Sequence, residues 1–249
     1  LQANPVGATF NSNDSTGSRD DETVVPNGGI VYITYDGTTI YSNRTGETYP
    51  YTPAGEELNP TLTRFGYNFM GWSTTQDGAN IVINSAGELT APWTASGTDG
   101  QTLYAVWEAK VITLNLTGDA STTVNDSEVF IEFDGTTFYA DYDGETLTNE
   151  IVPMAYKDGY IFSGFTMAGG TLVINNHGAV VNRWNYTDTE TDLTATFNAD
   201  TYTITFVDDD DDSTELGSVN YITDSTVNLL QPTRDGYTLS AVSYTHLTL

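Results

Sequence analysis

"GYNFMGW", residues 66–72, returns as "GYIFSGF" at residues 159–165 and begins a third time as "GYTLSAV" at residues 236–242. The spacing of its apolar residues is that of a β-strand, and alternation within it predicts Phe69 and Trp72 on opposite faces of that strand. A small domain has few other sources of apolar area, so we interpret these aromatic side chains as core. The alternative is an exposed aromatic platform that stacks on sugars.

The blocks around this phrase also repeat in the same order. "VYITYDGTTIYSNRTGET" (31–48) aligns without gaps to "VFIEFDGTTFYADYDGET" (129–146), and "LYAVW" (103–107) aligns to "LTATF" (193–197). Self-similarity at a nearly fixed spacing indicates tandem repeats. We therefore divide the chain into repeat 1, repeat 2, a truncated repeat 3 and a tail, with the boundaries 1–109, 110–199, 200–241 and 242–249.

Within the blocks the hydrophobic period is two, which predicts a mainly β fold. Asp-Gly at 36–37 and 134–135 predicts two-residue hairpin turns with positive φ. No long segment has a helical period, and we allow one short helix near residues 53–61. The joins "EAK" (108–110) and "NAD" (198–200) are short, which indicates a stiff string of domains.

Aromatic residues at matched positions form the predicted core motif: Tyr67, Phe69, Trp72 and Trp107 in repeat 1, and Tyr160, Phe162, Phe165 and Phe197 in repeat 2. The second copy replaces two tryptophans with phenylalanine, which keeps hydrophobic volume and reduces a stacking surface. Trp93 and Trp184 recur in a polar setting, so they are the candidates for a ligand-binding aromatic residue. Packing in the core or at a domain junction is the alternative for both.

The composition of the 249 residues excludes several partners. Seven basic residues against 34 acidic ones give a formal charge of −27, which disfavours nucleic acid and anionic membranes. The chain has no cysteine, so disulfides and cysteine metal sites are excluded. No apolar run approaches the roughly 18–20 residues of a membrane span, and we expect no membrane insertion within these residues.

A run of five aspartates, residues 208–212, raises the question of a metal. Calcium loops space their carboxylates at alternate positions, whereas consecutive side chains point in different directions. We therefore expect a solvated turn, with Asp208, Asp210 and Asp212 as weak calcium candidates. No other cofactor is expected.

Catalytic groups find little support in the sequence. His177 is the one credible histidine, and its counterpart in repeat 1 is Ala86. One unrepeated histidine without an evident nucleophile does not make a general base, so we predict no enzymatic activity.

"TRFGYNFMGW…GQTLYAVW" in repeat 1 resembles the Listeria–Bacteroides repeat, also called the internalin B-type repeat, and "YTITFV…QPTRDGYT" (202–238) resembles the start of another copy. Repeat 2 departs from the pattern at Phe165 and Phe197, where the family has tryptophan. The resemblance implies tandem small β-grasp-like (ubiquitin-like) domains with at most one short helix each. It also implies an extracellular protein of bacteria, either secreted or attached to the cell surface.

The expected function is that of a non-catalytic spacer or adhesion region, monomeric within a tandem array. Its expected partner is a protein or glycan on the surface of a host or neighbouring cell. The alternative function is that of carbohydrate-binding accessory modules of a larger secreted glycosidase.

The tail "VSYTHLTL" (242–249) is similar to the translation of an adapter used in sequencing libraries. We expect it to be an artefact and the chain to be a metagenomic gene fragment. The third repeat would then be unfinished, and its strands would not close a core.

Overall fold

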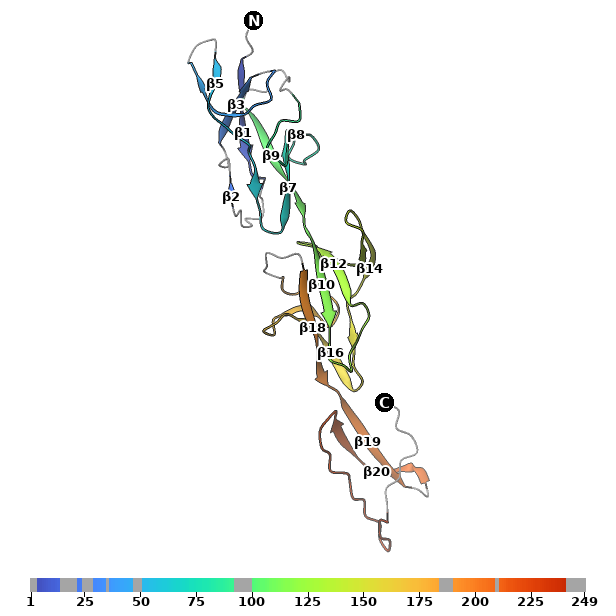
Figure 1. Ribbon diagram of the computed structural model, residues 1–249. Coiled ribbons are helices and arrows are strands. Elements are labelled where there is room, and N and C mark those ends of the chain that lie inside the picture. The colour runs from blue at the N-terminus through green and yellow to red at the C-terminus, as the bar shows by residue number, and fades with distance from the viewer. Residues whose placement is uncertain are drawn as a thin grey trace. The chain divides into compact units, whose positions relative to one another are not determined.

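The computed structural model describes residues 4–13, 22–23, 29–34, 36–46, 51–91, 100–183, 190–208 and 211–240. These residues form strands and turns, with no helix among them. The chain divides into two units (Figure 1): unit 1 holds Leu1–Val111 and Glu132–Asp134, and unit 2 holds Ile112–Ile131 and Gly135–Leu249.

The first sheet has seven strands in the order β5-β4-β3-β1-β9-β7-β8. The strands that come first and last along the chain, β1 and β9, are parallel neighbours at the centre of the sheet. The other neighbouring pairs are antiparallel. A separate two-stranded pair joins β2 to β6. The bounds are β1 (Pro5–Asn11), β2 (Glu22–Thr23), β3 (Ile30–Thr34), β4 (Tyr41–Thr45), β5 (Thr52–Glu57), β6 (Leu62–Thr63), β7 (Tyr67–Ser73), β8 (Ile81–Asn84) and β9 (Gln101–Ala109).

The second sheet repeats this order strand for strand, as β14-β13-β12-β10-β18-β16-β17. Here β10 and β18 are the parallel central pair, and β11 pairs with β15 apart from the sheet. The bounds are β10 (Val111–Thr117), β11 (Thr123–Val124), β12 (Glu128–Glu132), β13 (Phe138–Tyr142), β14 (Leu147–Ile151), β15 (Ala155–Tyr156), β16 (Tyr160–Thr166), β17 (Leu172–Asn175) and β18 (Glu190–Ala199).

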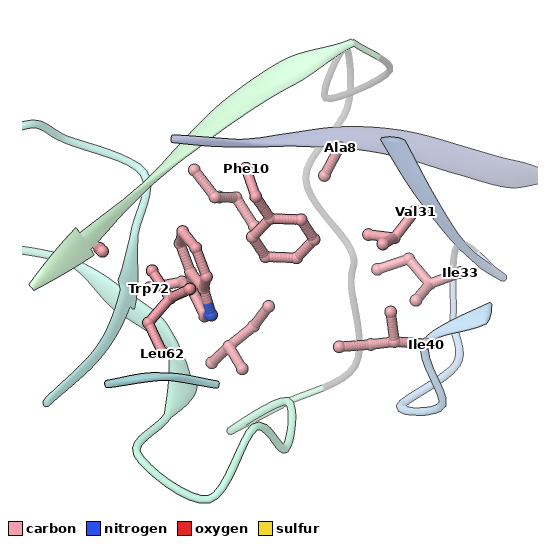
Figure 2. Close-up of a cluster of buried hydrophobic side chains, with 10 residues drawn as sticks. Ala8, Phe10, Val31, Ile33, Ile40, Leu62 and Trp72 are labelled. Carbon is pink, nitrogen blue, oxygen red and sulfur yellow. The ribbon is translucent and has the colours of Figure 1, made fainter. Parts of the chain in front are cut away.

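The core of unit 1 is a cluster of buried side chains from β1 to β9 (Figure 2). Trp72 and Phe10 are fully buried, and their rings meet edge to face with centroids 4.3 Å apart. The indole N–H of Trp72 donates to the carbonyl of Pro60 at 2.8 Å, which satisfies its one polar group. Burying each such side chain contributes roughly 1.5–3 kcal/mol.

Strict alternation along β7 was the wrong prediction, because a β-bulge interrupts it. Phe69 pairs with Trp107 and Gly71 pairs with Val106, so Met70 is an extra residue without a partner on β9. The extra residue returns Trp72 to the side that Phe69 occupies, and their ring centroids lie 5.6 Å apart. The same shift recurs in β16 between Phe162 and Gly164.

The two-residue Asp-Gly turns were also predicted wrongly. β3 ends at Thr34 and β4 begins at Tyr41, so the connection is longer than two residues. Gly37 has no positive φ, and its N–H donates to the carbonyl of Thr34 at 2.9 Å. Glycine thus takes the last position of a four-residue turn, where it is favoured without a positive φ. Gly135 likewise has no positive φ, in the connection from β12 to β13.

The helix allowed near residues 53–61 is not formed, because β5 occupies Thr52–Glu57. That segment pairs antiparallel with β4 and so satisfies its backbone groups as a strand.

The described part of repeat 3 is a hairpin of β19 (Thr201–Asp208) and β20 (Asp211–Ile222). Phe206 is its one hydrophobic residue in the buried set among residues 201–208 and 211–240. Asp208 pairs with Asp211, so these two aspartates are the last pair of the hairpin. The tail 242–249 lies outside the described residues.

Candidate functional site

Three turns with one geometry precede or contain the repeated Gly-Tyr phrase, and we call them the basic turns: residues 64–67, 157–160 and 234–237. In each, the tyrosine N–H donates to the carbonyl of the basic residue at 3.1 Å. The glycines between them, Gly66, Gly159 and Gly236, have φ of 79°, 78° and 80°. Glycine adopts this left-handed region without a steric penalty, which explains its place in all three copies.

Each basic side chain lies over the ring of the tyrosine three residues later. The distances to the ring centroid are 3.7 Å for Arg64 over Tyr67, 4.4 Å for Lys157 over Tyr160, and 4.5 Å for Arg234 over Tyr237. A cation over an aromatic face is attracted by the electron-rich ring, so the stack holds both side chains in place.

A hollow of about 310 Å³ lies beside the first basic turn, in unit 1. It is lined by Asn13, Arg64, Tyr67, Gln76, Asp77, Gly78, Val106, Trp107 and Asp134. The lining mixes two aromatic rings with charged and amide groups, and it comes from the ends of several strands.

Two aromatic side chains and one cation form the wall of this hollow. Arg64 is only 8% exposed, and its guanidinium lies 5.7 Å from the ring of Trp107 as well as over Tyr67. The indole N–H of Trp107 donates to the carbonyl of Ser12 at 2.8 Å, which fixes the orientation of that ring. The wall is therefore preorganised in the sense that its rings are held by hydrogen bonds and stacking.

Polar groups from two loops complete the lining. The amide of Asn13 donates to the carbonyls of Gln76 and Ala105, at 3.0 and 3.1 Å. A hydrogen bond from the side chain of Thr75, followed by one from the N–H of Ala79, lowers the pKa of Asp77. Asp77 is thus a carboxylate acceptor at neutral pH.

The side chains of this lining offer hydrogen-bond donors, acceptors and a ring face to a ligand. Asp77 accepts hydrogen bonds, Arg64 donates them and Trp107 offers an apolar ring, which together suit a polyhydroxylated ligand. None of the nine lining residues is a serine, cysteine or histidine. His177 lies in an exposed turn of unit 2, where its N–H donates to Asn175.

Repeat 2 has different residues at the matching positions. Phe10 pairs with Leu103 in the first sheet, and Leu116 pairs with Leu193 in the second, so Asn13 corresponds to Asp119 three residues on. Arg64 corresponds to Lys157 and Trp107 to Phe197 by the aligned motifs.

Asp119 and Lys157 form an ion pair of 2.7 Å. Hydrogen bonds from Lys157, Ser121 and Thr122 hold the pKa of Asp119 well below its usual range. In repeat 2 the carboxylate of Asp119 and the ammonium of Lys157 are therefore paired with each other.

The aromatic residues of the predicted core motif differ in how deeply they are buried. Trp72 and Phe165 are fully buried and Phe162 is 9% exposed. Tyr67, Phe69, Trp107, Tyr160 and Phe197 are partly buried.

Of the other predicted site residues, only some lie within the described part of the chain. Trp93, Trp184 and Asp210 lie outside the described residues, as does the side chain of Asp212. Asp208 is held by Arg234, whose Nη1 lies 3.2 Å from its Oδ2. The described residues contain no group of three or more acidic or histidine side chains placed to hold a metal.

Sequence reasoning missed the basic residues of the three turns. The signal was present, because Arg64, Lys157 and Arg234 each stand two residues before the repeated glycine. It also missed Asp134 and Asp224, which accept hydrogen bonds from Tyr67 and Tyr160. Those pairings join residues 67 and 64 positions apart, which no local pattern reveals.

Within the described residues, no helix has the length and apolarity needed to cross a bilayer.

Comparison with known proteins gives one family and one relative. Over 105 residues, or 42% of this chain, it is 29% identical to a protein of Evansella cellulosilytica named "Putative Gly-rich membrane protein". The match covers 10% of that relative's length. No solved structure matches the chain significantly. Residues 29–106 and 202–241 match the Listeria-Bacteroides repeat domain, in segments on either side of repeat 2. Together with the repeated motifs, these matches identify the chain as a carrier of Listeria-Bacteroides repeats.

Proposed function

We propose that this chain is a non-catalytic spacer region of a bacterial cell-surface or secreted protein. The observation that carries the proposal is the length of the joins. Lys110 alone separates β9 from β10, and Asp200 alone separates β18 from β19. A one-residue join leaves almost no slack between successive strands, unlike a Gly/Ser-rich linker.

Three further observations support this function. The matched family consists of repeat domains, and the Evansella relative is named as a membrane protein. The net charge of −27 keeps neighbouring copies soluble and apart. The proposal includes a β-grasp-type module. It is supported by the parallel central pair of each sheet, β1 with β9 and β10 with β18.

Small-angle scattering tests the spacer. The parent chain should fit one conformation over a range of salt concentrations. A variant with a Gly-Ser linker inserted after Lys110 and after Asp200 should require an ensemble. A parent curve that already requires an ensemble would contradict the proposal, as would a linker variant that scatters like the parent.

A second candidate function, glycan recognition, is favoured by the hollow beside Arg64 and Trp107. A glycan array probed with the labelled chain should show a saturable ligand, and Asp77→Asn and Trp107→Phe should each weaken its binding. Trp107→Phe is the conservative choice because repeat 2 already folds with Phe197 there. Binding lost instead in Trp93→Ala or Trp184→Ala would move the site to those residues, and a silent array would remove the candidate.

A further inference from the structure

A small network in unit 2 surrounds the joining residue Asp200. Its N–H donates to the carbonyl of Gly159 at 3.0 Å, and its carbonyl accepts from the N–H of Thr223 at 3.0 Å. The Thr223 hydroxyl also donates to the Gly159 carbonyl, at 2.6 Å. One residue further along each segment, the hydroxyl of Tyr160 donates to the carboxylate of Asp224. This hydrogen bond raises the pKa of Tyr160.

Unit 1 contains the same network around Lys110. Its N–H donates to the carbonyl of Gly66 at 2.9 Å, and its carbonyl accepts from the N–H of Phe133 at 2.8 Å. The hydroxyl of Tyr67 donates to Asp134 at 2.5 Å. All five residues belong to unit 1, as the five of the other network belong to unit 2.

A comparison of the two networks shows which residues are the same at matching positions. The joining residue changes from Lys110 to Asp200 and acts through its backbone in both. Phe133 changes to Thr223, which keeps the backbone hydrogen bond and adds one from its hydroxyl to Gly159. The glycine, the tyrosine and the aspartate are the same in both. The same five-residue arrangement thus recurs at both joins.

Steric limits explain the glycine at this place. A Cβ on Gly66 would lie 2.2 Å from the ring of Phe133, and one on Gly159 would lie 3.0 Å from a methyl of Thr223. The turn thus lies close to the side chain that follows the end of β12 in unit 1 and of β20 in unit 2. Both glycines also have the positive φ that other residues avoid.

We propose that this arrangement, which we call the joint clamp, fixes the orientation of repeat 3 on repeat 2 within unit 2 through the Tyr160–Asp224 hydrogen bond. The inference rests on the proposed spacer function and supplies its means. The third basic turn, residues 234–237, is then one half of another joint clamp. Tyr237 is 68% exposed, and its ring carries the guanidinium of Arg234 at 4.5 Å from the ring centroid. The partner that fits it is a further copy of the same repeat, which brings a joining residue and an aspartate.

Spin-label distance measurements on the full chain test the clamp. The chain has no cysteine, so Thr148→Cys with Ser218→Cys gives one unique label pair, on exposed positions of β14 and β20. The parent should give a single narrow distance distribution. Tyr160→Phe should lose it, because the change removes the hydroxyl donor and keeps the local shape. Asp224→Ala should lose it as well, because it removes the acceptor, whereas an asparagine there would still accept through its amide oxygen.

Tyr237→Phe is the matched control, since it removes the same hydroxyl from a turn of the same geometry, and it should leave the distribution unchanged. If Tyr160→Phe and Asp224→Ala also leave it narrow, the clamp is overturned and the stiff spacer stands. If the parent distribution is already broad, the spacer function fails and the clamp fails with it.

Discussion

At the scale of single residues, Gly71 and Gly164 determine the shape of the aromatic strands. Their φ values are 136° and 132°, and a Cβ would lie 2.2 Å from the carbonyl oxygens of Ile83 and Ile174, respectively. The bulge that these glycines permit turns Trp72 and Phe165 into the core. The second glycine of the repeated phrase is therefore a requirement of the backbone.

Gly71→Ala should destabilise unit 1 by roughly 1–3 kcal/mol, because it adds both a strained φ and a backbone clash. Gly144→Ala provides the control, with a φ of 93° and open space around its Cβ, so it carries strain without the clash. Denaturant unfolding followed by circular dichroism measures both. Equal losses in the two variants would show that the clash is relieved at no cost.

Trp72→Phe should also destabilise unit 1, although repeat 2 accepts Phe165 at the same position. The change leaves the buried carbonyl of Pro60 without its donor, and an unsatisfied buried acceptor costs roughly 1–3 kcal/mol. Trp107→Phe should cost less, since its partner carbonyl at Ser12 and the ring itself lie nearer to solvent. Thermal melts of the two variants give the comparison, and a greater loss from Trp107→Phe would refute this reasoning.

The ion pair of Asp119 with Lys157 predicts a dependence of stability on pH. Hydrogen bonds, that from Lys157 first, lower the pKa of Asp119 from its ordinary value of 3.8. A carboxylate whose folded pKa is depressed stabilises the fold above the unfolded pKa, and that stabilisation disappears as pH falls through the folded pKa. Melting temperatures of Asp119→Asn should lie below those of the parent at neutral pH and converge with them in acid. The exposed Glu150→Gln serves as control, and parallel curves for parent and Asp119→Asn would contradict the assignment.

At the scale of strands, the sequence predicts the elements well and their irregularities poorly. The described residues are mainly strand, as the period of two predicts, because that period is visible locally. The bulge at Met70 is not visible, since it depends on where β9 offers partners. Arg64 and Trp107, in the wall of the hollow, come from segments that only tertiary pairing brings together.

The hairpin of β19 and β20 should be less protected than either seven-stranded sheet. A two-stranded hairpin is marginally stable in water, and this one has Phe206 as its one buried hydrophobic residue among those described. Amide hydrogen exchange should be faster in its strands than in β16 and β18, which pair within a seven-stranded sheet. Equal protection would mean that the hairpin is stabilised by contacts beyond its own pair.

At the scale of the whole molecule, the order of the strands is kept twice while much of the sequence changes. Repeat 2 lies between the two segments that match the family, and it differs from repeat 1 at Phe165 and Phe197. Its sheet nevertheless has the same order and the same parallel centre. The pattern of pairing is therefore the property that these copies share, and the hollow beside Arg64 belongs to the part that varies.

The parallel centre of each sheet has a mechanical consequence. The chain enters the first sheet at the start of β1 and leaves it at the end of β9, and in a parallel pair these two points lie at opposite ends. Tension applied between them pulls the strands past each other and loads all of their backbone hydrogen bonds at once. The antiparallel hairpin of β19 and β20 has its two ends side by side, so the same tension opens its bonds one after another. We expect each seven-stranded sheet to resist pulling far longer than its equilibrium stability alone implies, because forced unfolding is governed by the rate of barrier crossing.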